Sequence, residues 1–343
     1  MKTRTLVTSL LLVAALLLPA GFAFSQNRMA DIKDAQDLLK SNPTFNNRLR
    51  LATLEYLQGS DALKSNDAAG AVSAMQTAVA TLDAGKGQVP ENHPVYEVSR
   101  YGLAYALVQS NKPYDALLVL DQLANASPDF GRARYLLGAT LMQIPGEKSQ
   151  ERAVAVMTQL AQDGRAPFKE WAAHAATRFA YDLSTLAHAR GDAAGAARML
   201  GAVTGAIGSD KGADATENVK VQFAQGVYLR DSGDVNGALD NLEATAKSDP
   251  GFRLANGVAL SGVLSNAYYG AGLNQLSLGG ETAPQLAVQM FDGALKSGDA
   301  GALDAHHGKA VAYTKLKQFD KASDELKTIV TKDPSYYEKI KQK

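Results

Sequence analysis

The chain has 343 residues, of which 46% are hydrophobic and 20% charged, a composition that supports a folded core rather than wholesale disorder. The 35 Lys and Arg residues balance the 35 Asp and Glu residues, so no basic field favours nucleic acid or anionic lipid as a partner. The sequence contains no Cys, which excludes disulfides, thiolate metal sites, a cysteine nucleophile and a lipidated cysteine.

The first residues have the layout of a secretory signal peptide. Lys2 and Arg4 precede an apolar run at residues 6–18, and small residues follow at 23–25. The run is shorter than the ~20 residues that span a bilayer as a helix. We therefore expect a signal peptide at residues 1–25, with an uncleaved anchor as the alternative. No later run is long enough to cross a membrane, so we expect the mature chain to be periplasmic or secreted, without a transmembrane segment.

A short phrase recurs four times along the rest of the chain, at residues 42–45, 127–130, 249–252 and 333–336. In each copy a polar residue is followed by Pro, one further residue and an aromatic residue. Pro ends the helix before it, and the aromatic residue begins the next. In the last three copies an Ala lies 12 residues before the Pro, after a turn: Ala116, Ala238 and Ala322. The predicted unit is a helix, a short turn and a second helix, with a small residue where the two helices approach closely.

This unit resembles the tetratricopeptide repeat (TPR), a helical hairpin of ~34 residues with small residues at positions 8 and 20, a large apolar residue at 24 and Pro at 32. Counting back from Pro128, Pro250 and Pro334 gives three close matches. Weaker copies lie at 52–80, 131–163 and 177–204, and another hairpin pairs 260–273 with 284–295 through an enlarged turn at 274–283. The alanines at position 20 are Ala71, Ala116, Ala153, Ala196, Ala238, Ala287 and Ala322.

The resemblance implies an all-α fold, a right-handed superhelical solenoid of stacked helix-turn-helix (TPR-like) hairpins. We expect about seven irregularly spaced hairpins in a single domain at residues 26–343, with short helices near 31–40 and 335–343 at its ends. One hairpin cannot bury its apolar face alone, so its stability depends on stacking against its neighbours.

The sequence offers no convincing catalytic or metal site. His306 and His307 are adjacent on a predicted helix and so do not share a face. Residues 232–243 have the oxygen spacing of a calcium loop, but Ser232 replaces the first Asp, and a helix starting near Val235 would prevent wrapping. No nucleophile elbow, zinc motif or phosphate loop occurs. We therefore expect no enzyme activity, metal or cofactor, and a site assembled from residues distant in sequence is the least favoured hypothesis.

In the TPR family, positions 2, 5, 9 and 12 of the first helix line the concave groove, so the resemblance implies candidate binding residues. Position 5 is aromatic in most hairpins here, and packing of the scaffold is the alternative role for these rings. The family's clamp for carboxylates uses Lys at 5 and Asn at 9, which are absent, so we prefer an extended, moderately apolar peptide. The candidates are Tyr56, Tyr101, Tyr105, Tyr135, Met142, Tyr181, His188, Phe223, Arg230 and His307.

The function that these features favour is a non-enzymatic scaffold or adaptor of the cell envelope, which binds a partner protein or an extended peptide in its groove. The alternative is a periplasmic, chaperone-like protein that holds unfolded clients in the same groove. Nucleic acid is not an expected partner, because the charge is balanced.

Overall fold

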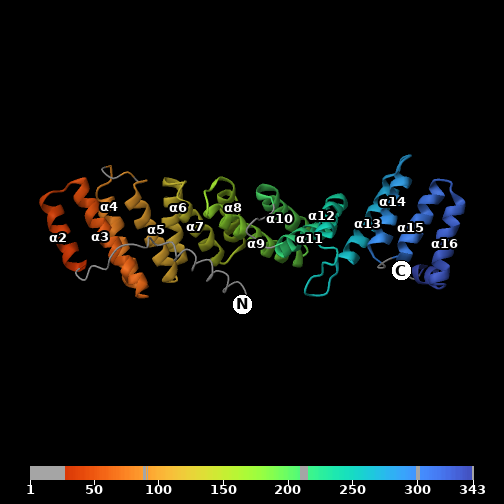
Figure 1. The fold of residues 1–343 in the computed structure, drawn as a ribbon, viewed down its shortest axis with the longest axis horizontal. Coiled ribbons are helices and arrows are strands. Elements are labelled where there is room, and N and C mark those ends of the chain that lie inside the picture. The colour runs from red at the N-terminus through yellow and green to blue at the C-terminus, as the bar shows by residue number, and fades with distance from the viewer. Residues whose placement is uncertain (1–27, 88–89, 91, 209–214, 299–301, 342–343) are drawn as a thin grey trace. The chain divides into compact units, whose positions relative to one another are not determined.

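The computed structural model describes residues 28–87, 90, 92–208, 215–298 and 302–341 (Figure 1). All the regular elements within these residues are helices. No helix in this part of the chain is both long and apolar enough to cross a membrane. The predicted signal peptide at residues 1–25 lies outside the described residues.

The helices follow the predicted order of hairpins. A helix α2 (Arg28–Ser41) comes first and a short helix α17 (Tyr336–Lys341) comes last. Between them lie seven pairs, each with a first and a second helix: α3 (Phe45–Lys64) and α4 (Ala68–Asp83), α5 (Pro94–Gln109) and α6 (Pro113–Ala126), α7 (Gly131–Gln143) and α8 (Glu147–Asp163), α9 (Phe168–Ala189) and α10 (Ala193–Ile207), α11 (Ala215–Ser232) and α12 (Val235–Ser248), α13 (Leu260–Leu278) and α14 (Ala283–Ser297), α15 (Ala302–Lys315) and α16 (Phe319–Lys332). Each position-20 alanine lies in a second helix and is buried, as the predicted repeat register requires.

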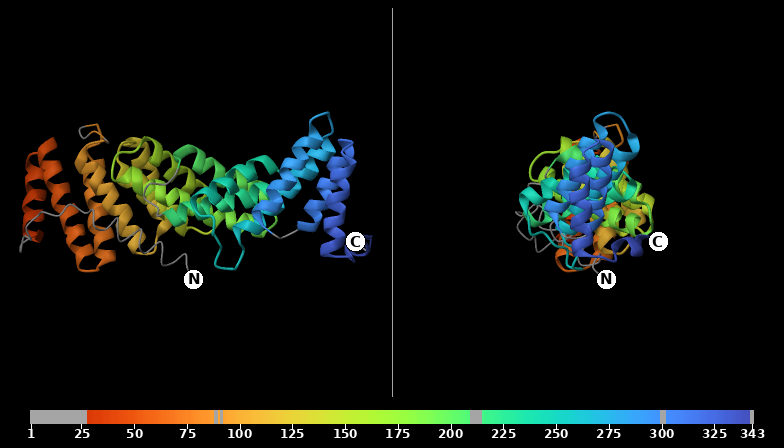
Figure 2. Two further views of the ribbon diagram at one scale, coloured as in Figure 1. Left: turned by 45° about the vertical axis from the view of Figure 1, so that its right-hand side comes forward. Right: turned by 90° about the vertical axis from the view of Figure 1, so that its right-hand side faces the viewer.

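The chain divides into two compact units. Unit 1 comprises Met1–Ala180 and Ala206–Gly212, and unit 2 comprises Tyr181–Gly205 and Ala213–Lys343. Within each unit, successive hairpins stack side by side, as the left-hand view of Figure 2 shows. The interpretation of residues 26–343 as one domain stays a prediction.

Five of the hairpin turns share a backbone conformation. The residue two places before the second helix lies in the left-handed region, which Gly and Asn adopt at low cost. These residues are Asn66 (φ 60°), Asn111 (57°), Gly191 (88°), Gly233 (92°) and Lys317 (59°). The turn therefore reverses the chain in very few residues and sets the second helix against the first.

Three second helices begin with the same motif, Asp-x-x-Gly-Ala. The Asp carboxylate accepts a hydrogen bond from the backbone N–H of the Gly, which satisfies a donor at the helix start. The pairs are Asp67 with Gly70 (2.8 Å), Asp192 with Gly195 (2.8 Å) and Asp234 with Gly237 (3.0 Å). Asp234 thus acts as the N-cap of α12, and the predicted helix start at Val235 is confirmed.

The core of a hairpin is a large side chain of the second helix packed on a glycine of the first. A Cβ on the glycine would lie 2.5 to 2.8 Å from that side chain in Gly59–Met75, Gly138–Met157, Gly226–Leu242 and Gly272–Phe291. Both Met75 and Phe291 also pack against a glycine on the first helix of the next hairpin, Gly102 and Gly308 respectively. The large residue therefore fills the space between neighbouring hairpins as well as within its own.

The predicted turn of the sixth hairpin, residues 274–283, is wrong. Helix α13 continues to Leu278, and α14 begins at Ala283. Leu276 packs against the cluster around Phe291, so burial favours the extra helical turn. Gly279 and Gly280, with φ of 71° and 100°, then end the helix.

Candidate functional site

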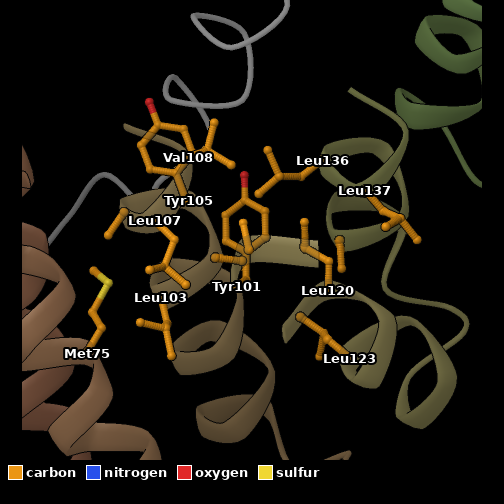
Figure 3. Close-up of a cluster of buried hydrophobic side chains, with 14 of the residues drawn as sticks. Met75, Tyr101, Leu103, Tyr105, Leu107, Val108, Leu120, Leu123, Leu136 and Leu137 are labelled. Atoms are coloured by element: carbon orange, nitrogen blue, oxygen red, sulfur yellow. The ribbon is translucent and has the colours of Figure 1, made fainter. Parts of the chain in front are cut away.

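Four tyrosines of the predicted binding set come together in unit 1. Tyr56 lies on α3, Tyr101 and Tyr105 on α5, and Tyr135 on α7. Helix α3 packs on α5 and α5 on α7, so these first helices form one face. The hydroxyl groups of Tyr101 and Tyr105 point to the same side of their helix (Figure 3). We call Tyr56, Tyr101, Tyr105 and Tyr135 the tyrosine cluster.

The rings of the tyrosine cluster are almost completely buried, which is more than binding of a partner requires. Each of the four side chains is only 3–6% exposed. Burial raises the pKa of all four phenols, that of Tyr135 to about 12. The phenols therefore stay protonated at neutral pH and can donate hydrogen bonds.

A cation accompanies these phenols. The positive charge of Arg132, on α7, opposes the rise in the pKa of Tyr56 and of Tyr101, so its guanidinium lies within electrostatic reach of both hydroxyls. Arg132 is partly exposed. It supplies further N–H donors beside the phenols.

Aromatic residues that closely follow a Pro explain much of the burial in four hairpins. Each ring packs back on the predicted binding residue of the hairpin before it. The pairs, with the distances between ring centroids, are Tyr101–Phe130 (5.8 Å), Tyr135–Phe168 (6.4 Å), Phe223–Phe252 (5.1 Å) and His307–Tyr336 (6.2 Å). Part of the aromatic series therefore packs the scaffold.

The prediction that Phe223 offers its ring to a partner is wrong. Phe223 is fully buried in the core of unit 2, where Phe252 and Leu260 belong to the same cluster. The loop that follows α12 folds back as a short backbone bridge between Arg253 and Ala259 and places Phe252 over the ring.

A cavity of about 460 Å³ opens beside the tyrosine cluster in unit 1, at the start of α7. Arg132 belongs to its wall, and so do the rings of Phe130 and Phe168, which contact Tyr101 and Tyr135. The lining residues are Pro128, Asp129, Phe130, Gly131, Arg132, Arg134, Leu160, Asp163, Gly164, Arg165, Ala166 and Phe168.

Two of the cavity's charges neutralise each other. Arg134 donates two hydrogen bonds to the Asp163 carboxylate, at 2.7 and 3.2 Å. Such a bidentate pair fixes both side chains. The lining also contains Arg132, Arg165 and Asp129.

Three other predicted residues meet in unit 2, on α9 and α11. His188 Nε2 lies 2.8 Å from a carboxylate oxygen of Asp231, and Arg230 Nε donates to the other oxygen at 2.8 Å. Tyr181 lies under the ammonium group of Lys220, 4.4 Å from its ring centroid. His188 and Arg230 are 32% and 28% exposed at the side chain, so this polar group is more accessible than the tyrosine cluster.

The last two predicted residues lie apart from these groups. Met142 is partly buried and packs against the core of unit 1. His307, on α15, contacts the rings of Tyr336 and Tyr337 on α17. Both have a packing role in the structure.

Sequence reasoning missed Arg132 and Lys220. Each lies three residues before an aromatic candidate, Tyr135 or Phe223, and so one turn away on the same helix face. A positive charge three residues before an aromatic candidate could have indicated both residues, but a search for aromatic residues alone does not find them. Tyr228, whose hydroxyl lies 3.0 Å from Thr185 Oγ1, was also missed.

The arrangement offers chemistry for binding. Within the described residues, no group of three or more His, Asp or Glu side chains is arranged to hold a metal ion. The chemistry that these residues offer is hydrogen-bond donation, positive charge and aromatic surface.

No protein-family model matches the chain, and no curated protein matches it. Solved structures that match it include the Cut9–Hcn1 hetero-tetramer of APC/C, with 12% identity over 90% of this chain and 50% of that chain, at a TM-score of 0.29. YrrB, described as a TPR protein with an unusual peptide-binding site, is 17% identical over 59% of this chain and 86% of its own, at a TM-score of 0.28. The TPR domain of P58(IPK) is 14% identical over 91% of this chain and 79% of its own, at a TM-score of 0.29.

This chain spans half the length of the Cut9–Hcn1 chain that it matches. Such identities and TM-scores are too low to carry a function from these proteins to this chain. The chain's own hairpins, with their small residues, buried alanines and large interfacial side chains, show the fold directly: it is an all-α protein of stacked TPR-like hairpins.

Proposed function

We propose that the chain is a non-enzymatic scaffold that binds an extended polypeptide segment of a partner protein on the first-helix face of unit 1. The observation that carries this proposal is the position of Arg132. Arg132 lies one helical turn before Tyr135 on α7, and it lines the cavity. Arg132 therefore places hydrogen-bond donors beside a cavity that can hold a side chain of the ligand.

The chemistry of this surface suits a peptide. The guanidinium of Arg132 donates hydrogen bonds, and the carbonyl groups of an extended backbone accept them. Phe130, Leu160 and Phe168 give the cavity apolar walls, which favour an apolar side chain of the ligand. The moderately apolar peptide expected from the sequence is consistent with this lining.

The test is peptide selection followed by affinity measurement. A random peptide library displayed on phage is selected against the purified chain, and an enriched peptide is titrated by fluorescence anisotropy. We expect Arg132→Ala to weaken binding by at least ~10-fold, since arginine at the centre of an interface is often an energetic anchor. Arg198→Ala, at an exposed position on α10, is the matched control and should leave the affinity unchanged.

Circular dichroism of both variants must show wild-type helicity, so that loss of binding is not loss of fold. Equal affinity of Arg132→Ala and wild type would remove the first-helix face of unit 1 from the binding site. Enrichment of no shared peptide sequence, together with suppression of client aggregation, would favour the chaperone-like alternative.

We further propose that the scaffold acts in the cell envelope. The support is the order of charges, apolar run and small residues within residues 1–25. We expect N-terminal sequencing of the protein from its native host to begin near residue 26. A product that begins at Met1 and stays in the cytosol would contradict both cleavage and export.

A further inference from the structure

Helix α16 presents an apolar stripe that no other described helix covers. Phe319, Leu326 and Val330 are 64%, 40% and 48% exposed, and exposed Ser323 lies between them. Their spacing of 4, 3 and 4 residues places all four on one helix face. The last helix, α17, packs on α15 instead, where the Tyr336 hydroxyl donates to Asp304.

The stripe includes a position that is enclosed in every other hairpin. Leu326 lies four residues after the buried alanine of its helix, Ala322. The residue at this place in the other six second helices is 0% exposed: Met75, Leu120, Met157, Leu200, Leu242 and Phe291. Both Met75 and Phe291 are covered by the next hairpin's first helix. The α16 stripe thus includes a helix-packing position on which no described helix packs.

The first described helix, α2, does not complement this stripe. Helix α2 is buried through Ile32 and Ala35, and Met29 is its single strongly exposed large apolar residue among those described. The remaining exposed positions of α2 are polar: Lys33, Asp34, Gln36, Asp37, Lys40 and Ser41. A polar surface of this kind is typical of a repeat that caps an array.

The stripe complements itself. When α16 is laid antiparallel against α16 of a second copy, Phe319 meets Val330 and the small Ser323 meets the larger Leu326. A two-fold axis makes each contact occur twice. Asp320 and Lys327, both exposed, lie on the same flank of the stripe, so each faces the opposite charge on the second copy, while Lys327 also pairs with Asp324 of its own helix at 3.2 Å.

We propose that two copies of the chain associate through α16, antiparallel about a two-fold axis, with Phe319, Leu326 and Val330 at the centre and Asp320–Lys327 ion pairs at the rim. Burial of the three apolar side chains supplies the association free energy.

Sedimentation-equilibrium measurement of the whole chain over a concentration series tests this pairing. We expect a monomer–dimer equilibrium for wild type, and Leu326→Glu should raise the dissociation constant by well over ~10-fold. Leu118→Glu is the matched control, since Leu118 is 68% exposed on α6, and it should leave the equilibrium unchanged.

The charge pair gives a test that does not disturb packing. Asp320→Lys and Lys327→Asp should each weaken the dimer by ~10-fold, and the double variant should restore the wild-type constant, because the ion pairs re-form with reversed polarity. A wild-type chain that stays monomeric, or open-ended oligomers, would overturn the proposal. So would a double variant as weak as the single ones.

Discussion

Phe291→Ala is expected to lower the free energy of unfolding of unit 2 by about 3–5 kcal/mol, the largest loss among the substitutions considered. Phe291 is fully buried on α14 and fills the space between two first helices. Its ring packs on glycines of both, Gly272 on α13 and Gly308 on α15, and contacts the ring of Tyr269. Truncation leaves a cavity that rigid helix backbones cannot close.

Urea denaturation followed by far-ultraviolet circular dichroism measures this loss. Leu286→Ala is the control, because Leu286 lies on the same helix but is 40% exposed, and it should cost far less. Similar losses from the two substitutions would show that Phe291 does not hold the two hairpins together.

Ala238→Leu is expected to cost about 1–3 kcal/mol through overpacking. Ala238 is 0% exposed on α12, at the close approach of α12 to α11. A Cβ on Gly226 of α11 would already lie 3.3 Å from the Ala238 carbonyl oxygen, so a larger side chain at 238 has no free space. The helices must separate or the leucine must adopt a strained rotamer.

The matched control is Ala194→Leu on α10, where the alanine is exposed and the same side chain meets solvent. Thermal unfolding of both variants should show a lower midpoint only for Ala238→Leu. If the two variants melt like wild type, the repeat register counted from Pro250 does not describe the packing.

The repeat register could be predicted because it depends on short-range chemistry. A small residue is needed wherever two helices touch, so alanines such as Ala116 and Ala322 mark the contact, and Pro marks the helix end. Turn residues with left-handed backbone, such as Asn66, and the Asp67–Gly70 cap follow equally local rules.

The candidate site was less predictable, since burial depends on segments that return from elsewhere in the chain. The pattern placed Tyr101 and Phe223 on the first-helix face, but it could not show that Phe130 and Phe252 would fold back over them. Likewise, the sequence pattern could not show that Arg132 on α7 is close enough to Tyr56 on α3 and Tyr101 on α5 for its charge to affect them.

The placement of a large residue between neighbouring hairpins, as with Met75 and Phe291, also affects how the protein opens. Much of the stability lies in interfaces between neighbours rather than in one central core, as in a one-dimensional chain of coupled units. The α15–α16 hairpin has such an interface on one side only, because Phe291 packs against Gly308 while Leu326 is left partly exposed. Local opening therefore starts most readily there and can stop at the Phe291 interface, so that partly folded forms keep the hairpins before it intact.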